Sequence, residues 1–155
     1  MNASDPTGPA APTPGSGADE PTGGPALTPE VTEVLRRPNP AVMATVRSDG
    51  SPVTVATWYL WLGGPVLLNL DGGRARLRHL RAVPRVSLTV LDGAEWHRHV
   101  SIQGPVTLEE DADLQWIDRI AMHYTGRPYP NRDRPRVNAW MTIGRVHVWG
   151  FRHRQ

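Results

Sequence analysis

The chain has 155 residues, of which 39% are hydrophobic, and its 17 basic and 15 acidic residues give a net charge of +2. This length supports one domain with its own core, and the absence of cysteine excludes disulfides, thiolate-bound metals and cysteine nucleophiles. No apolar run approaches the roughly 18 residues that span a bilayer, and no basic segment followed by an apolar stretch opens the chain. We therefore expect a soluble, cytoplasmic protein without a membrane partner.

Residues 1–26 are mostly Pro, Gly, Ala, Ser, Thr and Asp, with almost no bulky apolar side chain. Such a segment cannot bury enough surface to offset the entropy of ordering it. We predict a disordered tail over 1–26 and one domain over 27–155. Residues 1–35 hold five acids and no base, so the remainder carries seventeen arginines against ten acids. That surplus indicates an anionic partner, whether a phosphate-bearing cofactor, an acidic substrate or nucleic acid.

The predicted elements follow from capping, turn and periodicity signals. In chain order they are a helix opened by Thr28-Pro29-Glu30 and ended by Pro38, a strand at 41–47, a hairpin turn at 48–51, strands at 53–62 and 66–70, a helix from Ala75 to Val83, strands at 85–91 and 100–108, a helix that starts in the acidic segment 109–113 and ends at Gly126, and a strand at 141–151.

Hairpin-linked strands interrupted by short helices, without regular βαβ alternation, favour a barrel over a doubly wound sheet. We predict a mainly β (α+β) fold, a six-stranded antiparallel split β-barrel decorated by short helices. Both faces of the strand at 53–62 are apolar or amphipathic, so we expect both to be covered. The loop at 127–136, rich in Pro and Arg, is expected at the mouth of a pocket.

The most informative segment starts at Asp71-Gly72-Gly73. Five arginines, one histidine and no acid lie between Asp71 and Asp92. The two glycines let backbone N–H groups converge on an anion, the following helix adds its positive N-terminus, and guanidinium groups bind phosphate in a bidentate manner. The segment predicts a phosphate clamp, although a solvated arginine face in an arginine-biased proteome would look the same.

Five segments, taken in this order, carry a family resemblance over nearly the whole predicted domain. They are 44–52 (ATVRSDGSP), 57–61 (TWYLW), 73–80 (GRARLRHL), 84–88 (PRVSL) and 146–149 (VHVW). The sequence resembles the pyridoxamine-phosphate-oxidase-like split-barrel flavoproteins, and more closely their actinobacterial branch that uses the deazaflavin coenzyme F420. The resemblance implies an FMN-binding split-barrel fold and a homodimer.

The resemblance also implies cofactor-binding residues. The residues expected along the flavin ring are Val55, Ala56, Thr57, Trp58 and Tyr59. Those expected near its phosphate-bearing side chain are Asn69, Leu70, Arg74, Arg76 and His79. His99 and Trp149 match places where the partner chain or its edge closes the pocket. Arg76 stands where the family usually has Lys, and His79 where Asn is common; both keep a hydrogen-bond donor, which leaves open which flavin is held.

Other kinds of site find less support in the sequence. Trp58, Tyr59 and Trp61 could equally be core residues of any barrel. His97 and His99 would share one face of a strand, but no third ligand is nearby, and we predict no metal site. The acidic segment 109–113 is interpreted as a solvated helix start. No Ser-His-Asp arrangement or carboxylate pair is evident, so no catalytic side chain is assigned, as is typical of enzymes whose cofactor supplies the chemistry.

The leading hypothesis is a homodimeric oxidoreductase that transfers a hydride between F420H2 and a small unsaturated or conjugated molecule. One alternative is an FMN-dependent oxidase or reductase of the pyridoxamine-phosphate type. Another is a non-catalytic protein that binds flavin, F420 or tetrapyrrole. Nucleic-acid binding is disfavoured because there is no helix-turn-helix pattern and the aromatic residues lie in apolar strands.

Overall fold

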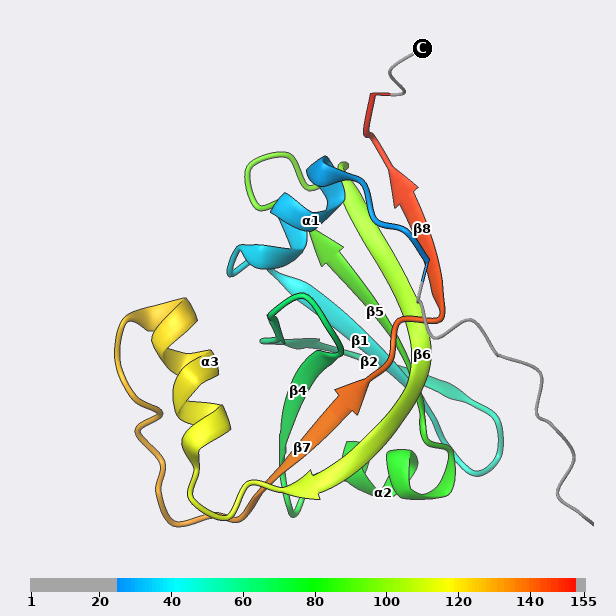
Figure 1. Cartoon of the computed structure of the whole chain (residues 1–155). Helices are drawn as coiled ribbons and strands as arrows, with labels where there is room; N and C mark the ends of the chain where they lie inside the picture. The colour runs from blue at the N-terminus through cyan, green and yellow to red at the C-terminus, as the bar shows by residue number, and fades with distance from the viewer. Residues whose placement is uncertain (1–24, 153–155) are drawn as a thin grey trace, which may run out of the picture.

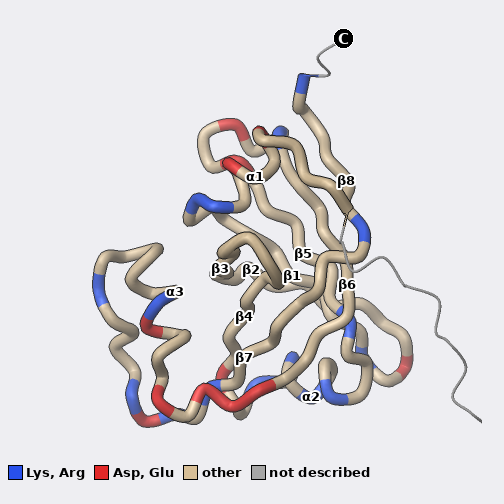
Figure 2. Tube along the Cα trace, viewed as in Figure 1, with Lys and Arg blue, Asp and Glu red and all other residues tan. Residues whose placement is uncertain are grey.

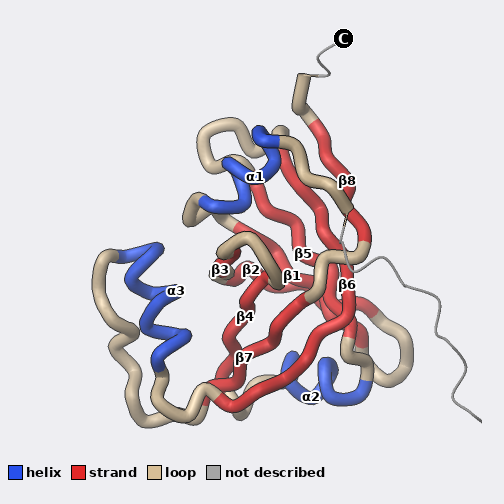
Figure 3. The backbone as a smooth tube through the Cα atoms, in the orientation of Figure 1, coloured by secondary structure: helices blue, strands red, loops and turns tan. Residues whose placement is uncertain are grey.

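The computed structural model describes residues 25–152, which form three helices and eight strands (Figures 1 and 3). In chain order these are α1 (Pro29–Arg36), β1 (Ala41–Val46), β2 (Pro52–Thr57), β3 (Leu60–Trp61), β4 (Val66–Asp71), α2 (Ala75–Ala82), β5 (Arg85–Leu91), β6 (His99–Glu110), α3 (Gln115–Thr125), β7 (Arg136–Met141) and β8 (Arg145–Trp149). The predicted mainly β, antiparallel split-barrel fold is confirmed, with eight strands in place of the six predicted. All but the last two residues of the predicted tail at 1–26 lie outside the described part. No helix within 25–152 is long and apolar enough to cross a membrane.

A two-residue connection closes the sheet on itself. The strand order is β2-β1-β5-β6-β7-β4-β3, so β2 and β3 lie at its opposite edges, although only Trp58 and Tyr59 separate them in sequence. The three steps from Thr57 to Leu60 span at most about 11 Å. The two edges must therefore lie close together, and the sheet must curl into an open barrel.

The single strand predicted over 53–62 is wrong because the chain breaks at this connection. Tyr59 turns inward, is 1% exposed, and donates its hydroxyl hydrogen bond to the backbone carbonyl of Arg37 at 2.9 Å. The expectation that both faces of the strand are covered is also wrong for β2. It is an edge strand that pairs only with β1, and its residues alternate between exposed and half-buried.

The last strand predicted over 141–151 corresponds to β8 alone, and β7, which shares only Met141 with that range, was not predicted. The long strand β6 pairs with β8 through 99–103 and with β7 through 106–110. The chain crosses between them at Thr142, whose backbone packs directly on Gly104: a Cβ on that glycine would lie 1.7 Å from the Thr142 carbonyl oxygen. The crossing needs a residue without a side chain at this point of β6.

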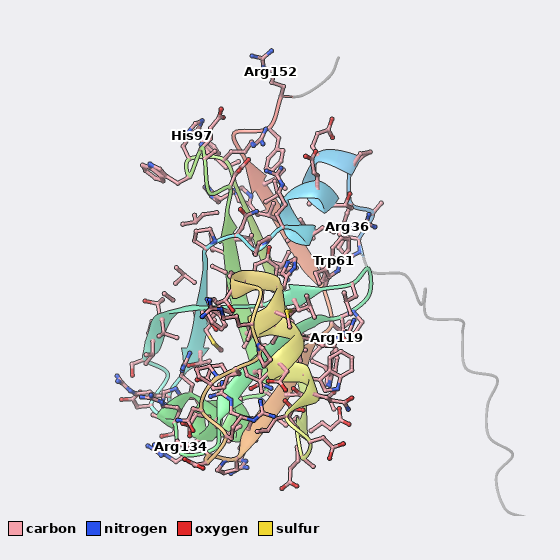
Figure 4. All side chains as sticks on the ribbon, turned by 90° about the vertical axis from the view of Figure 1, so that its left-hand side faces the viewer. Arg36, Trp61, His97, Arg119, Arg134 and Arg152 are labelled. Atoms are coloured by element: carbon pink, nitrogen blue, oxygen red, sulfur yellow. The ribbon has the colours of Figure 1, made fainter. Side chains whose placement is uncertain are left out.

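The three helices pack against the curled sheet. In Figure 1, α1 and α2 lie at opposite ends of the sheet, and both bury apolar residues in it. Figure 4 shows Arg36 beside Trp61, and its guanidinium lies 5.6 Å from that ring, which attaches α1 to β3. The third helix, α3, packs on β3, β4 and β7 through a small apolar cluster centred on Leu67 and Ile120.

The acidic segment at 109–113 is not a solvated helix start. Strand β6 continues through Glu110, and Asp111 is only 3% exposed. Its carboxylate accepts hydrogen bonds from the backbone N–H groups of Trp116 at 3.2 Å and Ile117 at 2.9 Å. Figure 2 shows acidic residues along the end of β6. Of the acidic segment, Asp111 fixes the first turn of α3.

An ion-pair cluster attaches the β5–β6 turn to the segment between α1 and β1. Asp92, which is 2% exposed, forms an ion pair with Arg98 and lies 3.8 Å from the guanidinium of Arg37. Asn39 accepts a hydrogen bond from Gly93 N–H at 3.1 Å and donates to the Val34 carbonyl at 2.8 Å. These contacts fix the proline-containing segment that forms one wall of the site described below.

Gly104→Ala should be strongly destabilising because its Cβ would overlap the Thr142 backbone, which cannot move aside without breaking the strand crossing. We expect the free energy of unfolding in urea to fall by about 3 kcal/mol or more. Gly64→Ala is the control, since a Cβ there has no neighbour within 4 Å. Equal stability of the two variants would contradict the close packing at Gly104.

Asp92→Asn tests the ion-pair cluster through its pH dependence. Burial alone would raise the pKa of Asp92, but the hydrogen bond from Arg98 and the charges of Arg98 and Arg37 outweigh it, and the pKa lies below its usual value. The resulting stability is present above the unfolded-state pKa of about 4 and is lost as the pH falls. The variant should lose about 1 to 3 kcal/mol at pH 7 and less at pH 3.

The measurement is urea unfolding at both pH values, with the exposed Asp113→Asn as the matched control. A deficit of the same size at pH 7 and pH 3 would show that the charge of Asp92 does not contribute.

Candidate functional site

A cleft with a volume of about 590 Å³ lies where the two edges of the sheet approach. Five parts of the fold contribute to it: the α1–β1 segment with the start of β1, the end of β2, β4 with α2, α3, and the loop leading into β7. Its lining residues are Pro38, Pro40, Ala41, Ala56, Thr57, Trp58, Asn69, Arg76, Ile117, Ile120, Tyr124, Tyr129 and Arg136. The volume falls in the range of small-molecule and cofactor sites.

An aromatic pair forms one wall of the cleft. The rings of Trp58 and Tyr124 stack with centroids 5.1 Å apart and planes inclined by 12°. The hydroxyl of Tyr124 donates to the Asn39 carbonyl at 2.7 Å and accepts from the Tyr59 N–H at 3.4 Å. Burial raises the pKa of Tyr124 to about 12, so the hydroxyl stays neutral and connects α3 to the α1–β1 segment.

Arg76 extends from α2 into the cleft. Its side chain is half-buried, and its Nη1 makes a long 3.7 Å approach to the sulfur of Met43. Burial, together with the charges of Arg74 and Arg136, lowers the pKa of Arg76, but a guanidinium remains charged at physiological pH. Arg76 forms no salt bridge with any described residue, and its donors are therefore available to a ligand.

Arg136, at the start of β7, is the second cation of the cleft and is held firmly. Its Nε donates to the side-chain oxygen of Asn69 at 2.8 Å, and two longer contacts of 3.4 Å reach the Asn69 carbonyl and the Tyr129 hydroxyl. The guanidinium also lies 4.8 Å from the centre of the Tyr129 ring. Among the described residues, no carboxylate forms an ion pair with it.

The cleft therefore combines aromatic and aliphatic walls with two guanidinium groups, and no acid is among its lining residues. Such a surface can hold a planar conjugated ring that carries anionic groups. None of the lining side chains is an evident nucleophile or a base near neutral pH, so a redox reaction here requires a bound cofactor.

The structure brings together five of the residues predicted for cofactor binding and places five others elsewhere. Lining the cleft are Ala56, Thr57, Trp58, Asn69 and Arg76. Tyr59 and Leu70 are buried in the core, and Val55 is half-buried against it. Arg74 is exposed at the N-terminus of α2, and His79 hydrogen-bonds through Nδ1 to Thr45 Oγ1 at 2.9 Å, which ties α2 to β1.

The two residues predicted to close the pocket from a partner lie on a different part of the sheet. His99 and Trp149 are register neighbours on β6 and β8, and Trp149 is 62% exposed. Neither lines the cleft of a single chain, and their role remains a prediction. His97 lies in the turn before β6, not on the same strand as His99. The described residues contain no group of three or more potential metal ligands.

Fewer arginines of the predicted phosphate clamp line the cleft than the arginine-rich sequence indicates. Arg74, Arg78 and Arg81 are exposed, and only Arg76 of this helix lines the cleft. The side of α2 that packs on the barrel carries Leu77 and Leu80, which are both buried.

The sequence-based interpretation missed the contribution of α3 and β7. No site role was predicted for Tyr124, and Arg136 was predicted only as the end of the loop at 127–136. That loop was nevertheless expected at the pocket mouth, and Tyr129 and Arg136 do line the cleft. The pairing of β7 with β4, which sets Arg136 opposite Asp71 and near Asn69, has no signal in local sequence.

Comparisons with solved structures agree on the fold. An F420 reductase is 26% identical with a TM-score of 0.69, covering 74% of this chain and 94% of its own. A conserved hypothetical protein from Mycobacterium tuberculosis is 24% identical with a TM-score of 0.65, covering 89% and 96%. HutZ, a heme storage protein from Vibrio cholerae, is 18% identical with a TM-score of 0.58, covering 79% and 94%. The last two show the fold alone.

No curated protein matches the chain. The family model described as pyridoxamine 5'-phosphate oxidase matches residues 27–150, which is nearly all of the described chain. The match contains every strand and helix of the barrel, together with every residue that lines the cleft. The chain therefore belongs to the pyridoxamine 5'-phosphate oxidase family of split-barrel proteins.

Proposed function

We propose that the protein is an oxidoreductase that uses coenzyme F420 and transfers a hydride between the reduced deazaflavin and a small conjugated organic molecule. The observation that carries the proposal is the half-buried Arg76, which enters an otherwise apolar and aromatic cleft without an acidic partner. The likeness to an F420 reductase, at 26% identity over 94% of that chain, supports the choice of cofactor.

The residues of the cleft suit such a cofactor by their chemistry. Arg76 supplies guanidinium donors for its phosphate, and the exposed Arg74 adds positive charge at the mouth. The edge of β2 at Ala56 and Thr57 offers backbone groups without a second strand partner, which can hydrogen-bond the polar edge of a flavin-like ring. Ile117 and Ile120 exclude water from the opposite wall. When bound, the deazaflavin supplies the hydride chemistry, and the protein supplies orientation and a dry site.

FMN is the alternative cofactor, because it also presents a phosphate and a planar ring to the same groups. A non-catalytic role in binding flavin, F420 or tetrapyrrole is the second alternative, favoured by the absence of an acid or base among the lining residues. Cofactor binding and turnover, measured separately, distinguish these functions.

We further propose that the protein is a homodimer. The outer face of β1 carries the half-buried Val42, Ala44 and Val46, whereas the side chains of α2 contact β1 at Met43 and Thr45, on its other face. This face is continuous with β6 and β8, where His99 and Trp149 lie. A second copy on it could bring those residues toward the cofactor, as the sequence resemblance implies.

Ala44→Arg introduces a charge into that face and should convert the protein to a monomer, because an unpaired charge in an apolar interface is costly. Sedimentation velocity of the full chain measures the change, with Gln115→Arg on the exposed part of α3 as the control. A wild-type protein that sediments as a monomer at micromolar concentration would rule out the dimer.

Titration of the purified chain with F420, followed by fluorescence, tests the central proposal. Saturable binding is expected, and Arg76→Ala should weaken it by about 1.5 to 3 kcal/mol, the value of a hydrogen bond to a charged group. Arg78→Ala, on the exposed face of the same helix, should bind like the wild type.

Lack of F420 binding by the wild-type protein would reject the proposal, and tight binding of FMN in its place would select the first alternative. Wild-type affinity in Arg76→Ala would show that another residue holds the phosphate.

A further inference from the structure

The cleft contains one more cation than a single phosphate group requires. Arg76 and Arg136 both line it, each close enough to the other for their charges to interact, and no lining residue is acidic. Two like charges in a partly desolvated cleft repel each other. If Arg76 serves the phosphate of the cofactor, Arg136 still lacks an anionic partner among the described residues.

Arg136 has the geometry of a prepared anion site. Of its five N–H donors, three contact Asn69 or Tyr129, and two have no hydrogen-bond partner among the described residues. One edge of the guanidinium is therefore fixed on β4 and one face is covered by the Tyr129 ring. The remaining donors of a planar, fixed guanidinium suit the two oxygens of a carboxylate.

A buried carboxylate sets the orientation of this arginine from the other side. The side-chain nitrogen of Asn69 donates to Asp111 Oδ2 at 3.0 Å and to Asn138 Oδ1 at 2.8 Å. Because Asp111 can only accept hydrogen bonds when ionised, the Asn69 amide must point its nitrogen toward Asp111 and its oxygen toward Arg136. Asp111 is itself fixed by the first N–H groups of α3.

The apolar groups near Arg136 define the rest of the ligand. Trp58 and Tyr124 provide an aromatic wall, and Ile117 and Ile120 provide an aliphatic one. A planar conjugated molecule fits between such walls, and a charged carboxylate can enter the cleft only where a cation compensates its desolvation.

We propose that Arg136 selects a substrate that carries a carboxylate attached to a planar conjugated system, and that Asn69 and Asp111 are its positioning residues. The assignment of Arg76 to the cofactor rests on the proposed function. The carboxylate preference of Arg136 does not, because it can be measured with and without cofactor.

The experiment uses matched pairs of acids and amides, namely benzoate, cinnamate and 2-naphthoate with their neutral amides, titrated calorimetrically into the full-length protein. The wild type should bind at least one acid about tenfold or more tightly than its amide. Arg136→Gln should abolish the preference for the acid without lowering the affinity for the amide, and Arg136→Lys should retain part of the preference. Arg127→Gln, an exposed arginine of the same loop, is the matched control and should keep the wild-type ratio.

Asp111→Asn tests the positioning role. The acid-over-amide ratio should fall while the affinity for the amide stays unchanged, because the amide of Asn69 is then free to turn. Equal loss of both affinities would show that Asp111 acts only on the fold of α3 and would overturn its positioning role.

Two results would overturn the proposal for Arg136. One is a wild-type protein that binds all three acids no better than their amides, with F420 present or absent. The other is an Arg136→Gln variant that loses F420 affinity as strongly as Arg76→Ala, which would place Arg136 in the phosphate site. Failure of the wild type to bind F420 would reject the proposed function alone, since the acid-over-amide ratio without cofactor still decides the role of Arg136.

Discussion

The two-residue connection through Trp58 and Tyr59 sets the curvature of the sheet and the position of the cleft. It joins strands at opposite edges of the sheet, so the sheet has to curl until those edges are within a few residues' reach. Tyr59 anchors the connection in the core by its hydrogen bond to Arg37, while Trp58 is left at the surface of the seam. The cleft lies at this seam because an edge strand, a buried anchor and an exposed aromatic ring meet there.

Hydrogen bonds of polar groups around the cleft connect the elements that form its walls. Tyr124 connects α3 to the α1–β1 segment, and Asp111 connects the start of α3 to Asn69 and so to Arg136. The third helix packs on the barrel through its small apolar cluster, and hydrogen bonds to Asp111 and to the Asn39 carbonyl, beside the cleft, fix its two ends. Substitutions of the ligand-binding residues should therefore alter the packing of α3, and substitutions in α3 should alter the geometry of the site.

Electrostatics and hydrophobic packing have separate tasks in this cleft. Apolar and aromatic side chains exclude water, and within this low-dielectric space each guanidinium interacts more strongly with an anion than it would in solution. Arg76 and Arg136 come from different elements and have different supports, one loosely placed beside Met43 and the other fixed by Asn69. This difference is the physical basis for assigning them to two anionic groups. The same fold occurs in an F420 reductase and in a heme storage protein, so the fold itself does not select the ligand.

Most of the local structure was predictable from sequence, because caps, turns and periodicity act over a few residues. This holds for the capped first helix, the hairpin at 48–51, the helix after Gly73 and the antiparallel, mainly β character. The family resemblance also pointed to Arg76, Asn69 and the residues at 57–58, all of which line the cleft. Only the tertiary structure decided that Arg74 faces solvent, that His79 bonds Thr45, and that Asp111 is a buried cap. It also supplied Arg136, because the pairing of β7 with β4 joins residues nearly seventy positions apart, and no local pattern specifies which side chains such a pairing brings together.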